Sequence, residues 1–242
     1  MRDEVIHCGI SKDDKKSSRY FGGRYIVGYD KGGESDSEDG WMPNYYVPTN
    51  YFIDWSEWAV NRMKTLTVRQ RDGTGLDRLC SRFQNADSYF VEGITFSMRG
   101  IYAPTFRVAG ANPYDVMSSK LFLSEALGLS QSLGWLASKW GKFAMKNYLE
   151  HTVAFDVDAL KEVPIPHQSI HAESIGKLVD QIIKMQRTNL RYDYASNEQL
   201  EIDRLVYAAY GFNEADIKEV ETWYARRYPK LAAAARRKAA KA

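Results

Sequence analysis

The hydrophobic pattern changes its period near residue 130, and this change constrains the fold more than any other feature. Earlier apolar and aromatic residues form short runs bounded by glycine or proline, at 89–97, 105–108 and 120–123. Such runs predict strands. Later residues recur at three- and four-residue intervals, as in Leu133, Leu136, Ala137, Trp140 and Ala144. That spacing predicts an amphipathic helix, so the sequence predicts a mixed α/β protein, with a strand-rich part followed by a helical C-terminal part.

Further helices are predicted downstream. Apolar stripes cover residues 171–187 and 199–210, and Gly211 is placed to end the second of them. Asn213, with Asp216 three residues later, is a suitable N-cap for one more helix.

Composition divides the 242 residues into four predicted segments. Residues 1–40 are rich in Gly, Ser, Asp and Lys, which predicts a loop-rich segment. Residues 41–166 form the predicted α/β core and end in an extended Val-Pro-Ile-Pro link. Residues 167–231 are a helical docking or spacer region, and residues 232–242, which hold no large apolar residue, are a flexible basic tail.

Targeting signals and cysteine pairs are absent from the sequence. Met1 is followed by Arg2, Asp3 and Glu4, and no apolar run is long enough for a membrane helix. We therefore expect a cytoplasmic protein without a membrane partner. Cys8 and Cys80 are far apart and have no metal-binding spacing, so both are expected to be ordinary thiols.

The charge is unevenly distributed, although the net charge is only +2. Residues 1–60 hold seven Lys and Arg against eleven Asp and Glu, whereas residues 61–150 hold twelve against seven. Residues 151–242 are nearly balanced, with fourteen against thirteen. A phosphate-binding surface needs only a local excess of cations, because counterion release depends on the groups at the contact. An ordinary solvated surface with unevenly distributed charges would give the same counts. Both interpretations, a phosphate-binding surface and an ordinary surface, therefore stay open.

Catalytic motifs are not found. The sequence lacks a glycine loop for S-adenosylmethionine, and Asn112-Pro113-Tyr114 lacks the second proline of an adenine-methylation motif. The combination of Asp156, Asp158 and Lys161 imitates a metal-dependent nuclease site only loosely. The four histidines form no metal-ligand pair on a predicted helix. We therefore expect no catalytic residue, no metal site and no cofactor bound by this chain.

Several strings resemble one family of proteins. They span most of the chain and read Tyr20-Phe21-Gly22-Gly23-Arg24-Tyr25, Asn44-Tyr45-Tyr46-Val47-Pro48-Thr49, Tyr51-Phe52-Ile53-Asp54-Trp55-Ser56, Glu92-Gly93-Ile94-Thr95-Phe96-Ser97 and Glu201-Ile202-Asp203-Arg204-Leu205-Val206-Tyr207. They resemble the C-terminal target-recognition (specificity) domain of fused type II restriction-modification enzymes and of BREX-type adenine-specific DNA methyltransferases, which act in phage defence.

The resemblance implies a function and partners. It implies a specificity domain that recognises double-stranded DNA and docks on a methyltransferase or restriction-modification catalytic subunit. The catalytic half of these enzymes has no counterpart in the chain, so S-adenosylmethionine is expected on the partner. A split gene, a truncated relic and an orphan specificity protein are all compatible with this pattern.

Basic residues are the candidates for DNA contact. Arg99 and Arg107 follow predicted strands and are the first candidates for reading bases, although Arg107 also suits a structural ion pair. Further cations surround a glycine-containing segment at 72–75 or follow the helix after Ser130: Arg62, Arg69, Arg71, Lys139, Lys142 and Lys146. The three lysines are predicted on the face opposite the apolar stripe, where they either contact phosphates or are simply solvated.

A protein-binding module is the alternative from another class. The apolar faces at 171–187 and 199–210 would dock such a regulator on a methyltransferase without any DNA contact, although a monomer core needs the same faces.

Overall fold

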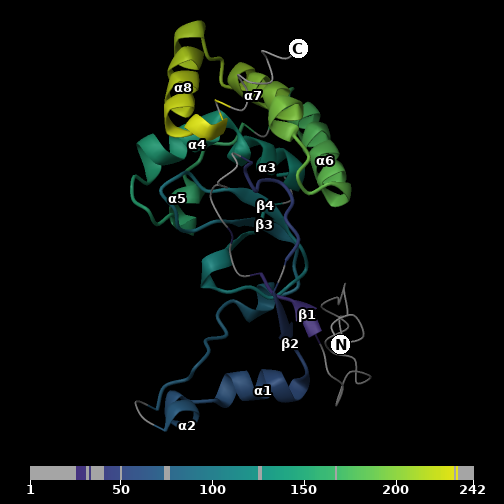
Figure 1. The fold of residues 1–242 in the computed structure, drawn as a ribbon, viewed down its shortest axis with the longest axis vertical. Coiled ribbons are helices and arrows are strands. Elements are labelled where there is room, and N and C mark those ends of the chain that lie inside the picture. Colours follow the sequence, from purple (N-terminus) through teal and green to yellow (C-terminus); the bar gives the residue numbers. More distant parts are fainter. Residues whose placement is uncertain are drawn as a thin grey trace. The chain divides into compact units, whose positions relative to one another are not determined.

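The computed structural model describes residues 26–30, 33, 41–49, 51–73, 77–124, 127–166, 168–231 and 233 (Figure 1). The chain forms two compact units, and both are assembled from separated stretches of sequence. The first comprises Met1–Lys31, Thr49–Glu92 and Gly110–Asp115, and the second comprises Gly32–Pro48, Gly93–Ala109 and Val116–Ala242. This division differs from the four predicted segments, whose ends at residues 40, 166 and 231 stay a prediction.

The first unit contains a small antiparallel sheet and two helices. Strand β1 (Ile26–Gly28) pairs with β2 (Phe52–Asp54), with Val27 opposite Ile53. Helices α1 (Glu57–Thr65) and α2 (Val68–Asp72) follow, and a 3₁₀ turn covers Ala86–Ser88. Buried Val27, Tyr89 and Phe90 form the core of this unit. Strand β1 corrects the prediction of a loop-rich segment at 1–40. Its Ile26 and Val27 are β-branched residues that favour a strand, and its backbone pairs with β2.

The second unit contains a three-stranded antiparallel sheet in the order β4-β3-β5. Its strands are β3 (Gly93–Phe96), β4 (Phe106–Ala109) and β5 (Lys120–Leu121), close to the predicted runs. A 3₁₀ turn at Val116–Ser118 precedes β5. Tyr45 continues the ladder beside β4, since its N–H donates to Phe106 O at 2.7 Å and its carbonyl accepts from Val108 N at 2.9 Å.

Helices cover this sheet in the same unit. Helix α3 (Leu129–Ala137) contacts both the sheet and α6 (Ala172–Thr188), and α7 (Glu198–Ala209) packs beside α6 (Figure 1). The remaining helical elements are α4 (Lys139–Ala144), a π-helix at Met145–Leu149, α5 (Val157–Lys161), a 3₁₀ turn at Tyr194–Ser196 and α8 (Glu214–Arg227). Apolar residues of α3, α5, α6 and α7 meet in one core with Phe96 and Phe106. Phe143 of α4 and Val220 of α8 form a second cluster with Tyr207.

The helix predicted after Ser130 is interrupted at Ser138. This residue has an extended backbone with φ −64° and ψ 161°, so α3 ends and α4 starts a new helical register. The Ser138 side chain caps α4 by accepting a hydrogen bond from Gly141 N at 3.0 Å. Because the helical register restarts at Ser138, the spacing that begins at Leu133 does not predict on which face of α4 the lysines lie.

The predicted start of the last helix is confirmed. Asn213 accepts hydrogen bonds from Ala215 N and Asp216 N, and the Asp216 carboxylate accepts from Asn213 N in return. This capping box begins α8, and Gly211, at φ +66°, lies between α7 and α8. Within the part of the chain that the structure describes, none of the helices combines the length and apolar character that a bilayer span needs.

The protein therefore has a mixed α/β fold, as the sequence predicts. Helices α1 and α2 lie between strands in sequence, so the order of a strand-rich part followed by a helical part stays a prediction.

Candidate nucleic-acid interface

A basic arm, defined as residues 57–82, carries the exposed cations of the first unit that lie in the described part of the chain. Ser56 caps α1 by accepting from Ala59 N at 3.3 Å, and Thr67 and Gln70 form a capping box that begins α2. The chain turns at Gly73, which has φ +71°, and returns as a bridge between Thr67 and Leu79. Figure 1 shows α1 leading away from β1 and β2 toward α2. Residues 74–76 of the predicted glycine-containing loop lie outside the described residues.

The charge of the arm is strongly positive. Residues 62–82 contain six cations and only two carboxylates, Asp72 and Asp77. All six cations are exposed: Arg62, Lys64, Arg69, Arg71, Arg78 and Arg82. The two carboxylates each meet one arginine, since Arg69 Nε lies 3.0 Å from Asp77 Oδ1 and Arg71 Nε lies 2.6 Å from Asp72 Oδ1. The hydrogen bond from Arg71 lowers the pKa of Asp72.

Four cations of the arm are left without such a carboxylate. Among the described residues, Arg62, Lys64, Arg78 and Arg82 make no ion pair. Two of them lie over aromatic rings, with Arg62 5.7 Å from the Trp58 ring centroid and Lys64 5.4 Å from that of Phe83. Exposed, uncompensated guanidinium and ammonium groups are the donors that bind phosphate oxygens.

Trp58 is the residue of this arm that sequence reasoning missed. Trp58 is 69% exposed on α1, although tryptophan is highly buried on average. The signal that finds it is the Ser56 cap, because a helix starting at residue 57 places Trp58 and Arg62 four apart on one face.

The two arginines expected to read bases differ in exposure. Arg99 is exposed in the second unit, and its backbone is held by a bridge to Ala154. Arg107, however, is 5% exposed within β4, and its guanidinium lies so close to Gly33 that a side chain at position 33 would collide with it. A base-reading role for Arg107 is therefore wrong in this conformation.

The three lysines expected on a solvated face do not share one. Lys142 is 1% exposed and donates from Nζ to Pro104 O at 3.0 Å. Lys139 Nζ lies 2.8 Å from Glu221 Oε1, and the half-buried Lys146 donates to Thr152 O at 2.7 Å. The break at Ser138 explains the difference, because it directs Lys142 into the core. Phosphate contact by Lys142 is excluded while this packing persists.

Burial gives Lys142 and Asp203 unusual acid-base properties. Desolvation lowers the pKa of Lys142 to about 7, against the opposing effect of the Asp203 carboxylate. Desolvation also raises the pKa of Asp203 to about 6, although Lys139 works in the opposite direction. Asp203 Oδ1 accepts from Lys139 N at 2.9 Å and from Gln199 Nε2 at 3.1 Å. These contacts join α4 to α7 inside the second unit.

The remaining motifs have structural roles. Asp156 caps α5, while Asp158 and Lys161 form an exposed ion pair at 2.7 Å on the same helix. Asn112 fills the space beside Gly28, and Tyr114 bridges to Asp30. Within the described ranges, no three His, Cys, Asp or Glu side chains come together in a way that could hold a metal ion.

The apolar faces proposed for docking on a protein lie in the core. Ile175, Val179, Ile182, Ile202 and Val206 are each 0% exposed. These residues make up the apolar stripes of α6 and α7. The stripes are therefore buried in the core of the second unit and are not exposed to a partner protein.

Arg62, Arg69 and Arg71 are thus brought together on one arm, whereas Arg99 and the three lysines lie on the second unit. No protein-family model matches this chain, and a comparison with curated proteins likewise gives no match.

Proposed function

We propose that this chain is a sequence-specific recognition module for double-stranded DNA. It has no catalytic centre of its own and works beside an adenine methyltransferase or restriction-modification subunit that binds S-adenosylmethionine. The observation that carries the proposal is the basic arm, with six exposed cations, three carboxylates and the exposed Trp58. The methyltransferase partner rests on the resemblance of the sequence strings alone.

Two kinds of contact are assigned by this proposal. Arg62, Lys64, Arg78 and Arg82 bind phosphates, because such contacts position a protein on the duplex without reading its sequence. Arg99 is the candidate for base contact, since an exposed guanidinium can form two hydrogen bonds with guanine.

The arm is tested by the salt dependence of duplex binding. In the variant Arg78→Ala/Arg82→Ala, two phosphate contacts are removed, and each contributes about 0.9 to the slope of log K against log salt. We expect weaker binding of any 20-base-pair duplex and a slope reduced by about 2, measured by fluorescence anisotropy at several salt concentrations.

The matched control removes two exposed lysines from α6. Lys177→Ala/Lys184→Ala changes the net charge by the same amount, on the second unit. It should leave the slope within about 0.5 of the unsubstituted protein. Equal slopes for both double variants would show that the arm is an ordinary solvated surface.

A further inference from the structure

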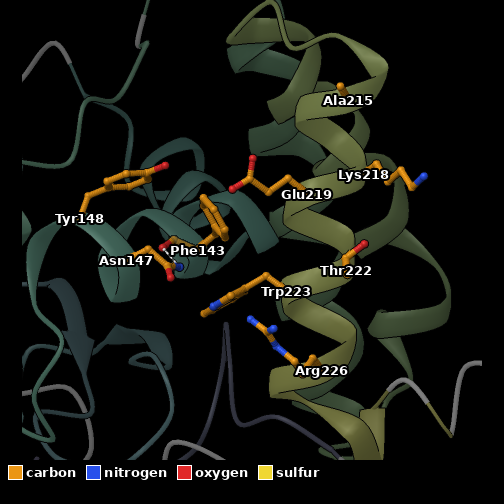
Figure 2. A pocket seen from close by; sticks show the side chains of 9 residues that line it. All are labelled: Phe143, Asn147, Tyr148, Ala215, Lys218, Glu219, Thr222, Trp223 and Arg226. Atoms are coloured by element: carbon orange, nitrogen blue, oxygen red, sulfur yellow. Dashed lines mark hydrogen bonds between the residues drawn. The ribbon is translucent and has the colours of Figure 1, made fainter.

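An open groove follows one side of α8 in the second unit (Figure 2). Helix α8 contributes residues spaced three and four apart, which places them on one stripe: Ala215, Lys218, Glu219, Thr222, Trp223 and Arg226. Phe143, Asn147 and Tyr148 form the opposite wall. The volume is about 560 Å³, within the range of roughly 300–1,000 Å³ that is usual for small-molecule sites.

The π-helix shapes the opposite wall. Glu150 N donates to Met145 O at 2.9 Å, a bond that spans five residues. In an α-helix, residues five apart point about 140° away from each other, whereas a π turn brings them to one side. Tyr148 accordingly stands beside Phe143, with 5.8 Å between ring centroids and 70° between planes. Single π turns are frequent at functional sites.

Three aromatic rings are held in place around the groove. Phe143 is buried, and its ring lies 5.4 Å from that of Trp223 at an angle of 88°. Helix α8 is fixed on another side, since Glu221 Oε1 accepts from Lys139 Nζ at 2.8 Å and from Tyr207 OH at 2.9 Å. The Tyr148 side chain is 66% exposed, so its ring is accessible to a ligand.

The polar groups of the groove favour a ligand that is both planar and anionic. Lys218 and Arg226 outnumber Glu219, so the lining carries a net positive charge that disfavours a cation between the rings. Figure 2 shows Glu219 and Trp223 pointing from α8 toward the wall that carries Phe143 and Asn147. Asn147 Nδ2 donates to Phe143 O at 2.7 Å, so its amide oxygen, together with the Glu219 carboxylate, can accept hydrogen bonds from the edge of a base. The cations suit a phosphate.

We infer that this groove binds an unpaired nucleotide. The base stacks on Tyr148, its edge meets Glu219 and Asn147, and its phosphate meets Arg226. Stacking on an aromatic ring tolerates every base, because every base has a π face. This site goes beyond the proposed function, since it needs neither a duplex nor a methyltransferase.

The test uses a single-stranded hexadeoxynucleotide of five thymidines and one 2-aminopurine, whose fluorescence falls when the base stacks. The protein should quench this fluorescence, and Tyr148→Ala should weaken binding about 10-fold or more. Tyr148→Phe keeps the ring and should bind within about 2-fold of the unsubstituted protein. Arg226→Gln should lower the salt slope by about 0.7, the contribution of one phosphate in a single strand.

The control truncates an exposed apolar side chain on α7. Leu200→Ala, at a residue that is 56% exposed, should leave binding unchanged. Absence of quenching, or equal binding by the Tyr148→Ala and Leu200→Ala variants, would overturn the inference. If free dAMP displaces the fluorescent oligonucleotide, the groove is a mononucleotide site. If only an unlabelled oligonucleotide displaces it, the groove is a site for a single strand. Both results support the groove.

The variant Arg78→Ala/Arg82→Ala separates this inference from the proposed function. It should lose duplex affinity while it still quenches 2-aminopurine, because the basic arm contributes nothing to the groove. Loss of quenching in this variant would assign the signal to the arm and contradict the groove.

Discussion

Lys142 shows how a single residue links burial to pH. Its ammonium group is buried and donates a hydrogen bond to Pro104 O, and the Asp203 carboxylate on α7 raises its pKa against the larger effect of desolvation. The pKa of Lys142 in the folded chain is about 7, below the ordinary value of 10.5. Between these values the unfolded chain binds more protons, so the free energy of unfolding rises with pH. Below pH 7 both states are protonated, and the penalty for burying the charge is fully present.

Replacement of this lysine should flatten the stability profile at alkaline pH. Relative to the Lys142→Met variant, we expect the unsubstituted protein to gain up to about 1.4 kcal/mol of unfolding free energy per pH unit between pH 7 and 10. Urea unfolding at four pH values measures the difference. Lys184→Met, at an exposed position, is the control and should follow the unsubstituted profile. Parallel profiles for Lys142→Met and the unsubstituted protein would contradict the assignment.

Asp203 should produce the opposite slope at acid pH. Its pKa is raised from 3.8 to about 6, so the folded chain binds more protons than the unfolded chain between these values. Its contribution is most favourable below pH 3.8 and is lost as the pH rises to 6. Asp203→Asn should remove this decline, as measured by urea unfolding between pH 4 and 6. A decline that persists in the variant would assign it to other carboxylates.

Arg99 should discriminate between DNA sequences. Because its side chain is exposed, Arg99→Ala should weaken binding to the recognised duplex by about 1–3 kcal/mol and hardly change binding to random duplex. Competition binding with both duplexes measures the two losses. Equal losses would assign Arg99 to phosphate contact instead.

At the scale of elements, the close contact between α3 and α6 requires glycine, which has no side chain, at position 134. A Cβ atom at Gly134 would lie 2.3 Å from Ile175 Cγ2, and Ile175 is completely buried. At Gly176, in contrast, the nearest atom would be Gln131 Cγ at 3.0 Å, on a longer and only partly buried side chain.

The two glycines should therefore respond differently to alanine. Gly134→Ala should destabilise the protein by about 1–3 kcal/mol, because the β-branched Ile175 cannot move aside. Gly176→Ala should be less harmful, since alanine is favoured over glycine in a helix by about 1 kcal/mol. Thermal unfolding of both variants tests the order. If Gly176→Ala destabilises the protein more than Gly134→Ala, the residues around Gly134 can move to make room for a Cβ atom, and the explanation is wrong.

Element by element, the sequence predicts what is encoded locally. The stripe of Ile175, Val179 and Ile182 identifies α6, and Asn213 with Asp216 identifies the start of α8. The break at Ser138 has no such signal, because serine also occurs within helices and its extended backbone depends on tertiary packing. The burial of Lys142 has no local signal for the same reason, since a charged side chain is rarely buried and its partners lie far away in sequence. For Arg107 the sequence leaves a structural ion pair open beside base reading.

At the scale of the whole molecule, the two units hold different proposed binding sites. The basic arm belongs to the first unit, whereas Arg99 and the groove along α8 belong to the second. The arm was predicted in part, because its charge is continuous in sequence. The groove was not, since Phe143 and Trp223 are eighty residues apart and only the folded chain brings their rings together.

Recognition of a DNA sequence is the property that we propose for this chain. The most direct measurement is enrichment of a randomised duplex library on the purified protein, alone and with an adenine methyltransferase from the same source, at two salt concentrations. We predict enrichment of one short motif that persists at the higher salt, where contacts to phosphates alone are weakened. Binding without any enriched motif, both with and without the methyltransferase, would contradict target recognition.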